Sequence, residues 1–408
     1  MTRQVRLVLM LIVALAVMGL ASCDHYTCKV TFGSSTCGSG GGGGLSQGGG
    51  GGGNTALALG YYVNGTQVQS FELDPQASLM ATPNFVIPTL PTNPYSAMAI
   101  AQEQFLYLPY GTGQLFAWSI DGGSGALTAL NGSPFAAPYA AGLAHSSQPL
   151  TPIITDPSGN YLYIADTTDS LIYAFSIDSS TGLLTAVPLS PFASVVPPWN
   201  LATDGTGKYL YVSEGNATGE GVAMAVFTIN SGTGALSGGT AMAFNMWQVQ
   251  GEPTGKFMIG VDGHTGLNSD NTPADDNLYV FPINQATGVL QTPTAIPTTN
   301  GPIAVVVHPN GQFVYDFSLV KASGFDGPLE GFSLNPTTGT LTSLGAPFSS
   351  LTTIPYGGMF DQSGSYMFVH ASNALGVLNI DPTTGIPTEP STPIGLGSDG
   401  PWAVTDVP

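Results

Sequence analysis

Positive charge is scarce in this sequence of 408 residues. Six Lys and Arg residues stand against 25 Asp and Glu, which gives a formal net charge of -19, and the two arginines, Arg3 and Arg6, lie at the extreme N-terminus. A surface this acidic excludes nucleic acid as a partner, because binding to a phosphate backbone requires Lys and Arg. The lack of arginine elsewhere also argues against a site built to hold a phosphate group.

Cysteine is almost as scarce. Cys23, Cys28 and Cys37 are the three cysteines, and all of them precede residue 56. The rest of the chain therefore has no thiol to serve as a nucleophile or a metal ligand. Cys28 and Cys37 could pair in an oxidising compartment, although their spacing does not require it.

Several patterns typical of helices and of hydrolases are also missing. No stretch beyond the N-terminal segment shows the 3.6-residue apolar period of a helix, which excludes a helical repeat protein. The sequence contains no GxSxG and no HExxH motif, so serine hydrolase and zinc protease chemistry have no support. The 55 Gly and 32 Pro residues instead indicate an all-β protein rich in turns.

The first 22 residues have the layout of a secretory signal peptide. Arg3 and Arg6 precede an uncharged run from Leu7 to Leu20, and small residues follow. The segment Leu20-Ala21-Ser22-Cys23 resembles the bacterial lipoprotein signal, which implies cleavage before Cys23 and lipidation of its thiol. The alternative is an uncleaved anchor, but the apolar run is short for a bilayer span. After cleavage, 4 basic residues would face 25 acids, a net charge of -21.

Residues 23–55 are predicted to be a tether. They include the stretch GSSTCGSGGGGGLSQGGGGGGN at 33–54, which cannot bury apolar surface. A flexible chain of this length spans on the order of 26 Å. These glycines do not form a phosphate-binding loop, because no strand precedes them and no GK[ST] follows.

One phrase recurs seven times in residues 56–408. It ends a strand with Asp or Asn and, in six of the copies, places Gly four residues later, at Asp74, Asp121, Asp178, Asn230, Asn284, Asn335 and Asp381. These positions are 46 to 57 residues apart, which is the size of a propeller blade. The phrase predicts a turn in which Asp or Asn bonds its own backbone and Gly takes a positive φ. In the first copy Ser78 replaces the Gly.

A second phrase lies about 17 residues before most of these turns. It reads DPSGNYLYIAD at 156, DGTGKYLYVSE at 204 and EPTGKFMIGVD at 252, with similar forms at 308 and 361. Each copy predicts a tight turn that leads into a strand rich in aromatic and β-branched residues. The two phrases together give four strands in each unit, so the fold class is predicted as an all-β, seven-bladed β-propeller of four-stranded blades.

The first unit begins directly at its second strand, because the Gly-rich segment precedes it. The missing first strand is matched by PWAVTDVP at 401–408, which resembles PWNLATDG at 198. We therefore predict that the C-terminal strand joins the first blade beside Ala56–Val63 and closes the ring, which removes two open sheet edges.

The repeats DPSGNYLYIAD, FSIDSSTGLLTAVPLSPF and SIDGGSGALTALNGSPF resemble those of the seven-bladed lactonase-like propeller family, which includes bacterial 6-phosphogluconolactonases and fungal muconate cyclases. The resemblance covers about residues 56–408. It implies hydrolysis of a lactone, and Glu214 in YVSEG matches a Glu that family members carry after the YLYV strand. Those members also carry an Arg-His pair on a first strand, and the corresponding strands of this chain contain neither residue.

Three side chains are candidates for catalysis. Glu214 could act as a general base toward water, which requires a carboxylate with a raised pKa in a partly dry site. His145 and His370 could act as acid, base or metal ligand. The structural alternatives are a carboxylate that bonds loop amides and histidines that serve only packing.

Other residues suggest ligand binding. Asp262, Asp270, Asp275 and Asp276, with His264, occupy one long loop whose oxygen density suits Ca²⁺, although the spacing is not that of an EF-hand. Trp199, Trp247 and Trp402 are predicted to occupy equivalent places near the first strands, one to a blade, and could stack on a sugar or could cap the packing between blades. Lys321 is the one cation on the expected ligand face.

Two functions remain open. The first is an extracytoplasmic, lipid-anchored lactonase, acting on a sugar lactone or a similar substrate with no required cofactor beyond an optional Ca²⁺. The second is a propeller without catalysis that binds a carbohydrate, a peptide or a protein. In both cases we expect a monomer attached to a bacterial membrane through Cys23.

Overall fold

The computed structural model describes residues 58–64, 67–73, 79–82, 97–110, 113–136, 152–215, 221–262, 277–299, 301–318, 329–348, 355–371, 374–389, 393–395 and 402–406. The chain divides into two compact units, Met1–Gly52 and Gly53–Pro408. All described residues belong to the second unit. They form strands and turns, and none of them belongs to a helix that could span a membrane.

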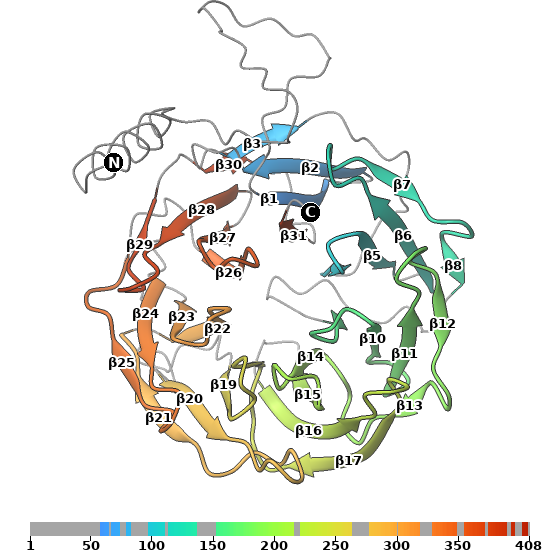
Figure 1. The fold of residues 1–408 in the computed structure, drawn as a ribbon. Helices are drawn as coiled ribbons and strands as arrows, with labels where there is room; N and C mark the ends of the chain where they lie inside the picture. Colours follow the sequence, from blue (N-terminus) through green and yellow to red (C-terminus); the bar gives the residue numbers. More distant parts are fainter. Residues whose placement is uncertain are drawn as a thin grey trace, which may run out of the picture. The chain divides into compact units, whose positions relative to one another are not determined.

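The second unit contains seven antiparallel sheets arranged as blades around a central axis (Figure 1). Blade 1 contains β31 (Trp402–Asp406), β1 (Ala58–Asn64), β2 (Gln67–Leu73) and β3 (Leu79–Thr82). Blade 2 contains β4 (Ala99–Ala101), β5 (Phe105–Tyr110), β6 (Gln114–Ile120), β7 (Leu127–Ala129) and β8 (Phe135–Ala136). Blade 3 contains β9 (Ile153–Thr155), β10 (Tyr161–Asp166), β11 (Leu171–Ile177), β12 (Leu184–Ala186) and β13 (Phe192–Ala193).

The remaining blades repeat this order. Blade 4 contains β14 (Asn200–Thr203), β15 (Tyr209–Gly215), β16 (Gly221–Ile229) and β17 (Leu236–Met242). Blade 5 contains β18 (Gln248–Gly251), β19 (Phe257–Val261), β20 (Asn277–Pro282) and β21 (Thr294–Pro297). Blade 6 contains β22 (Pro302–Val307), β23 (Phe313–Ser318), β24 (Leu329–Leu334) and β25 (Leu341–Ser343). Blade 7 contains β26 (Pro355–Phe360), β27 (Tyr366–Ala371), β28 (Ala374–Ile380), β29 (Pro387–Thr388) and β30 (Ile394–Gly395).

The ring closes through the last strand of the chain. β31 pairs with β1 in antiparallel register, from Ala58 opposite Asp406 to Tyr62 opposite Trp402. The first blade thus combines the two ends of the repeat region, as the sequence predicts. The prediction of a seven-bladed, all-β propeller closed by its C-terminal strand is confirmed.

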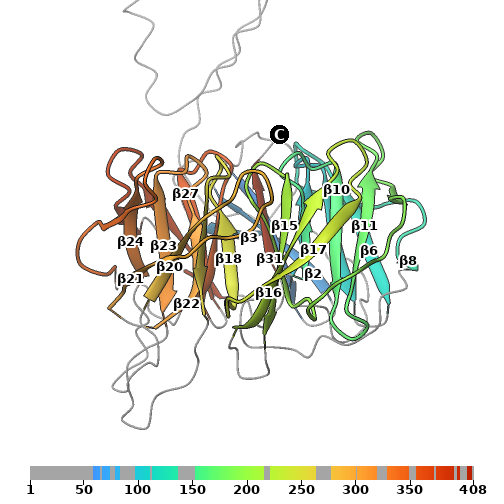
Figure 2. The ribbon, with the colours of Figure 1, turned by 90° about the horizontal axis from the view of Figure 1, so that it is seen from below.

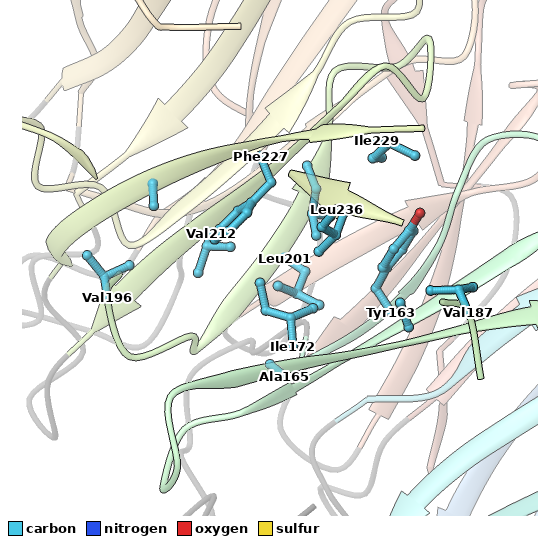
Figure 3. Close-up of a cluster of buried hydrophobic side chains, with 13 residues drawn as sticks. Tyr163, Ala165, Ile172, Val187, Val196, Leu201, Val212, Phe227, Ile229 and Leu236 are labelled. Atoms are coloured by element: carbon cyan, nitrogen blue, oxygen red, sulfur yellow. The ribbon is translucent and has the colours of Figure 1, made fainter. Parts of the chain in front are cut away.

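The core lies between blades rather than within them. Seven clusters of buried apolar side chains each combine residues from two neighbouring blades. Figure 3 shows the cluster between blades 3 and 4, where Tyr163 and Ile172 of one blade meet Leu201, Val212 and Phe227 of the next. Each sheet therefore buries both faces only because a neighbour covers each of them.

The turns follow the predicted chemistry. Asp178 Oδ1 accepts hydrogen bonds from the N–H groups of Ser180 at 3.0 Å and Thr181 at 2.9 Å, and Gly182 follows with φ of 68°. The hairpins between first and second strands also contain a buried acceptor. In blade 3 it is Asp156, whose Oδ1 accepts from the N–H of Tyr161 at 2.7 Å.

Candidate functional site

The two faces of the ring differ in their connections (Figure 2). The tight turns that follow first and third strands, such as those at Asp156 and Asp178, lie on one face, because neighbouring strands run antiparallel. The opposite face, which we call the loop face, carries the ends of the second strands and the connections between blades. At this face the second strands end in or near Asn64, Tyr110, Asp166, Glu214, Asp262, Ser318 and Ala371.

Glu214 stands at the loop face of blade 4. It lies opposite Ala223 in the pairing of β15 with β16, and the register shifts immediately after it. Side chains alternate along a strand, so Glu214 projects on the same side as Val212. Val212 belongs to the cluster between blades 3 and 4 (Figure 3), which places the Glu214 carboxylate at the loop-face end of this apolar seam.

The environment of Glu214 matches the requirement for a general base. Its side chain is half-buried, and burial raises the pKa of the carboxyl above its ordinary value. Within the described part of the chain, no hydrogen bond occupies the carboxylate. Residues 216–220, the loop that follows Glu214, lie outside the described residues, so the general base and the carboxylate that bonds loop amides both stay predictions.

Asp166 occupies the same position in blade 3, three residues after the tyrosine that corresponds to Tyr211. Its side chain is buried, and its Oδ1 accepts hydrogen bonds from the N–H groups of Thr168 at 3.0 Å and Asp169 at 3.1 Å. Asp166 thus stabilises the loop that follows it. No sequence motif distinguishes Asp166 as a site residue, and in the structure it is the counterpart with which Glu214 can be compared.

Two further polar side chains of blade 4, Asn200 and Ser213, are buried, and no sequence motif marks them. Asn200 Nδ2 donates to the carbonyl oxygen of Trp247 at 2.8 Å, and Ser213 Oγ donates to the same oxygen at 2.7 Å. These bonds join blade 4 to the start of β18 in blade 5. The similar stretches PWN and MWQ, each near a first strand, indicated Trp247 in the sequence. No sequence pattern indicated that Asn200 and Ser213 would bond the same carbonyl oxygen.

The tryptophans fall into two groups. The rings of Trp199 and Trp247 lie 6.2 Å apart between their centroids, tilted by 54°. Trp247 is fully buried, and Trp199 is half-buried. Trp402 is not equivalent to them. Trp402 lies opposite Tyr62 in blade 1. The residue of blade 4 that corresponds to Tyr62 is Val212, and it lies opposite Leu201. Trp402 therefore corresponds to Leu201, which stands two residues after Trp199.

His370 lies in blade 7 and not beside Glu214. Its ring stacks on that of Trp402, with centroids 5.9 Å apart and an angle of 19° between the planes. Trp402 in turn packs against the cluster that joins blades 7 and 1. Blades 4 and 7 lie three positions apart around the ring (Figure 1), so the structure does not bring His370 and Glu214 together.

The remaining predicted residues lie outside the described residues: His145, His264, Lys321, Asp270, Asp275, Asp276 and Cys23. Asp262, the one described member of the predicted Ca²⁺ loop, is half-buried after the end of β19. The described residues contain no group of three or more His, Cys, Asp or Glu side chains that could hold a metal ion. The Ca²⁺ site remains a prediction.

The fold defines the class of this protein as a seven-bladed β-propeller. Residues 114–244, which include Glu214, match the family model described as "Lactonase, 7-bladed beta-propeller". A search of curated proteins finds no match. The family match supports placing the chain with the lactonase-like propellers.

Solved structures agree on the fold. A provisionally assigned 6-phosphogluconolactonase of Bacteroides uniformis superposes with a TM-score of 0.61 at 15% identity, covering 85% of this chain and 99% of that one. The periplasmic gluconolactonase of Pseudomonas aeruginosa gives 0.58 at 15% identity, covering 86% and 100%. A protein from Lactobacillus plantarum gives 0.62 at 16% identity, covering 86% and 99%. At these identities the likeness concerns the fold alone.

Proposed function

We propose that this protein hydrolyses a lactone at the loop face of blade 4, with Glu214 as the general base. The observation that carries the proposal is the half-buried Glu214 carboxylate, whose pKa is raised by burial and whose oxygens are not engaged by the described residues. The family match over residues 114–244 and the gluconolactonase among the similar structures support the choice of a lactone as substrate.

The proposed step is a simple hydrolysis. Glu214 accepts a proton from water as the water oxygen bonds to the lactone carbonyl carbon, which places negative charge on the carbonyl oxygen. When this intermediate collapses, the bond between the carbonyl carbon and the ring oxygen breaks, and the ring oxygen takes the proton from Glu214. Because His370 lies in blade 7, His145 is the histidine that would polarise the carbonyl in this proposal; a Ca²⁺ ion held by Asp262, Asp270, Asp275 and Asp276 would supply the same polarisation.

Replacement of Glu214 by Gln tests the base. We expect Glu214→Gln to lower turnover of a panel of sugar and aliphatic lactones by about 10²- to 10⁴-fold. The matched control is Asp166→Asn, which changes the corresponding residue of blade 3 and should leave turnover unchanged. Full turnover in Glu214→Gln would refute the role of Glu214.

The pH profile gives a second test. A base acts only when ionised, and burial raises the pKa of Glu214, so activity should rise with pH and reach half its maximum above the ordinary carboxyl pKa of about 4.3. The measurement is kcat/KM against pH on the full chain. A profile that is flat through the acid range would contradict the assignment.

The second candidate is a binding propeller without catalysis. The absence of an Arg-His pair from the first strands favours it, and the half-buried Trp199 ring at the loop face provides an aromatic surface. If no lactone is turned over, binding to sugar acids and oligosaccharides should be measured by calorimetry. Loss of heat release in Trp199→Ala would then identify the binding site.

We further propose that the protein is a lipoprotein on the extracytoplasmic side of a bacterial membrane. The support is the arrangement of Arg3, Arg6, the apolar run and Leu20-Ala21-Ser22-Cys23. Metabolic labelling with a fatty acid in a bacterial host should label the full chain, and Cys23→Ser should abolish the label. A labelled Cys23→Ser variant would refute this anchor.

A further inference from the structure

A pair of carboxyl groups is buried in the seam between blades 5 and 6. Asp316 on β23 is fully buried, and Glu330 on β24 lies directly opposite it and is 7% exposed. The N–H of Glu330 donates to Asp316 Oδ1 at 3.0 Å, whereas Asp316 Oδ2 has no hydrogen-bond partner in the described part of the chain. Burial of two carboxylates without cations would be strongly unfavourable.

The repeat shows that this pair is exceptional. Asp316 follows the repeated tyrosine of its blade, Tyr315, and the six corresponding residues are Tyr62, Leu108, Ile164, Val212, Gly260 and Val369. None of these residues is a carboxylic acid. In blade 1 the corresponding cross-strand pair is polar but neutral, and it is joined by a hydrogen bond from Tyr62 to Gln69 of 2.6 Å. Blade 6 alone places two acids at this point.

The pair also connects the two blades. Asp316 projects on the same side as Val314, which packs in the cluster that joins blades 5 and 6. Thr299, in the connection from β21 to β22, donates its N–H to Glu330 Oε1 at 2.7 Å. The carboxyl pair therefore anchors the segment that leads from one blade to the next.

We infer that Asp316 and Glu330 hold one proton between them and that this proton ties blade 6 to blade 5. A protonated Asp316 can donate its O–H to the Glu330 carboxylate, because cross-strand neighbours on one face stand close together. This hydrogen bond would satisfy the oxygen that otherwise lacks a partner, and it would leave a single negative charge in the seam.

The charges around the pair agree with this assignment. Burial first, and then the charge of Glu330, raise the pKa of Asp316 well above its ordinary value. The blade 5 side chains in the cluster beside the pair are apolar and include Val261, Leu278 and Val280. β22 of blade 6 contributes no titratable side chain. Among the described residues, Glu330 is thus the one titratable group whose charge acts on Asp316; a hydrogen bond with the Ser318 side chain lowers the pKa of Asp316, but burial and the charge of Glu330 outweigh it.

The sign of the pH dependence follows. The pKa of Asp316 is raised in the folded protein, so its contribution to stability is complete below the ordinary carboxyl pKa and is lost as pH rises through the raised pKa. Above that pH, two ionised carboxylates would repel each other in the seam. Blades 5 and 6 should then separate more readily.

The experiment combines infrared spectroscopy with unfolding of the full chain. The wild-type protein should show the C=O stretch of a protonated carboxylic acid at a pH above the ordinary Asp pKa of about 3.9, and Asp316→Asn should lack it. The midpoint of thermal unfolding should fall by several degrees as pH rises from there through the raised pKa of Asp316. Asp316→Asn should remove this pH step, and Glu330→Gln should move it, because it removes the charge that acts on Asp316.

A matched control distinguishes the pair from any buried acid. Asp166→Asn changes another buried carboxyl, at the end of the second strand of blade 3, and it should keep both the infrared band and the pH step. Absence of the band from the wild-type protein would overturn the inference even if neither variant folds. Stabilisation of the wild type, but not of Asp316→Asn, by Ca²⁺ or Mg²⁺ would also overturn it, since a cation would then neutralise the pair.

Discussion

Leu189 occupies a position that suits glycine. Its φ is 72°, a left-handed conformation that bulky residues rarely adopt, and its side chain is 86% exposed. The corresponding residue of blade 2 is Gly132, with φ of 87°. The left-handed conformation costs about 1–2 kcal/mol for a residue with a Cβ. Because the Leu189 side chain is exposed, burial of its apolar surface does not offset this cost.

We therefore predict that Leu189→Gly stabilises the protein by up to about 1 kcal/mol, after subtraction of the extra chain entropy of glycine in the unfolded state. Urea unfolding of the two proteins measures the difference. Leu183→Gly, in the ordinary backbone region, should destabilise and serves as the control. A less stable Leu189→Gly variant would show that the exposed leucine has a stabilising contact.

His308 replaces the carboxylate that other blades place in the first hairpin, as at Asp204 and Asp361. Its Nδ1 accepts from the N–H of Asn310 at 3.1 Å, and its Nε2 lies 2.9 Å from the carbonyl oxygen of Gly364 in blade 7. These two bonds fit the neutral ring with a proton on Nε2. Burial is the main cause that lowers the pKa of His308.

Because the pKa of His308 is lowered in the folded protein, acid should lower the free energy of unfolding through this residue. The unfolded chain binds a proton near the ordinary pKa of about 6.5, whereas folded His308 does so only at lower pH. The contribution of His308 to stability is thus complete above about pH 6.5 and is lost as pH falls toward the folded pKa. The stability difference between the wild type and His308→Asn should shrink from about pH 7 to pH 5 in thermal unfolding. A constant difference would contradict this account.

At the scale of the element, one hydrogen bond repeats from blade to blade. A tyrosine hydroxyl on the second strand donates to the carbonyl oxygen of the turn glycine in the next blade, with distances of 2.6 to 3.0 Å. The five pairs are Tyr61 with Gly125, Tyr107 with Gly182, Tyr163 with Gly234, Tyr211 with Gly288 and Tyr315 with Gly385. Ile259 and Phe368 stand at the corresponding positions of blades 5 and 7.

Removal of one of these tyrosine hydroxyls should weaken the contact between two neighbouring blades. Tyr211→Phe leaves the buried carbonyl of Gly288 without this donor, so we expect a loss of about 1–2 kcal/mol in the free energy of unfolding. Tyr366→Phe, which removes a hydroxyl from another partly buried ring, is the control and should cost less. Equal losses in the two variants would mean that the bond between the blades adds nothing.

The turn glycines show what the repeat motif left undetermined. The sequence explained Gly182 through its positive φ alone. In the structure a Cβ at Gly182 would also collide with the ring of Phe105 in the preceding blade, and Gly234 has the same relation to Tyr161. The second constraint could not be read from the sequence, because it joins residues more than 70 positions apart.

At the scale of the whole molecule, stability depends on closing the ring. Ala403 and Val404 are buried, and β31 supplies the innermost strand of blade 1. A chain that ends before Trp402 would expose the edge of β1 and remove these contacts, so we expect a loss of at least about 3 kcal/mol. Thermal unfolding compares it with a chain that lacks residues 38–50 of the Gly-rich segment. The closure account fails if both deletions lower the midpoint equally.

The sequence by itself determined the number of blades, the turn chemistry and the origin of the closing strand, because these depend on local patterns that repeat. It also selected Glu214, since that residue follows a recognisable strand. Only the tertiary structure decided that Asp166 bonds its own loop, that Glu214 is half-buried at the end of an apolar seam, that His370 stacks on Trp402, and that Asp316 faces Glu330. These relations arise between strands and between blades, where burial and neighbouring charge rather than local pattern determine what a side chain can do.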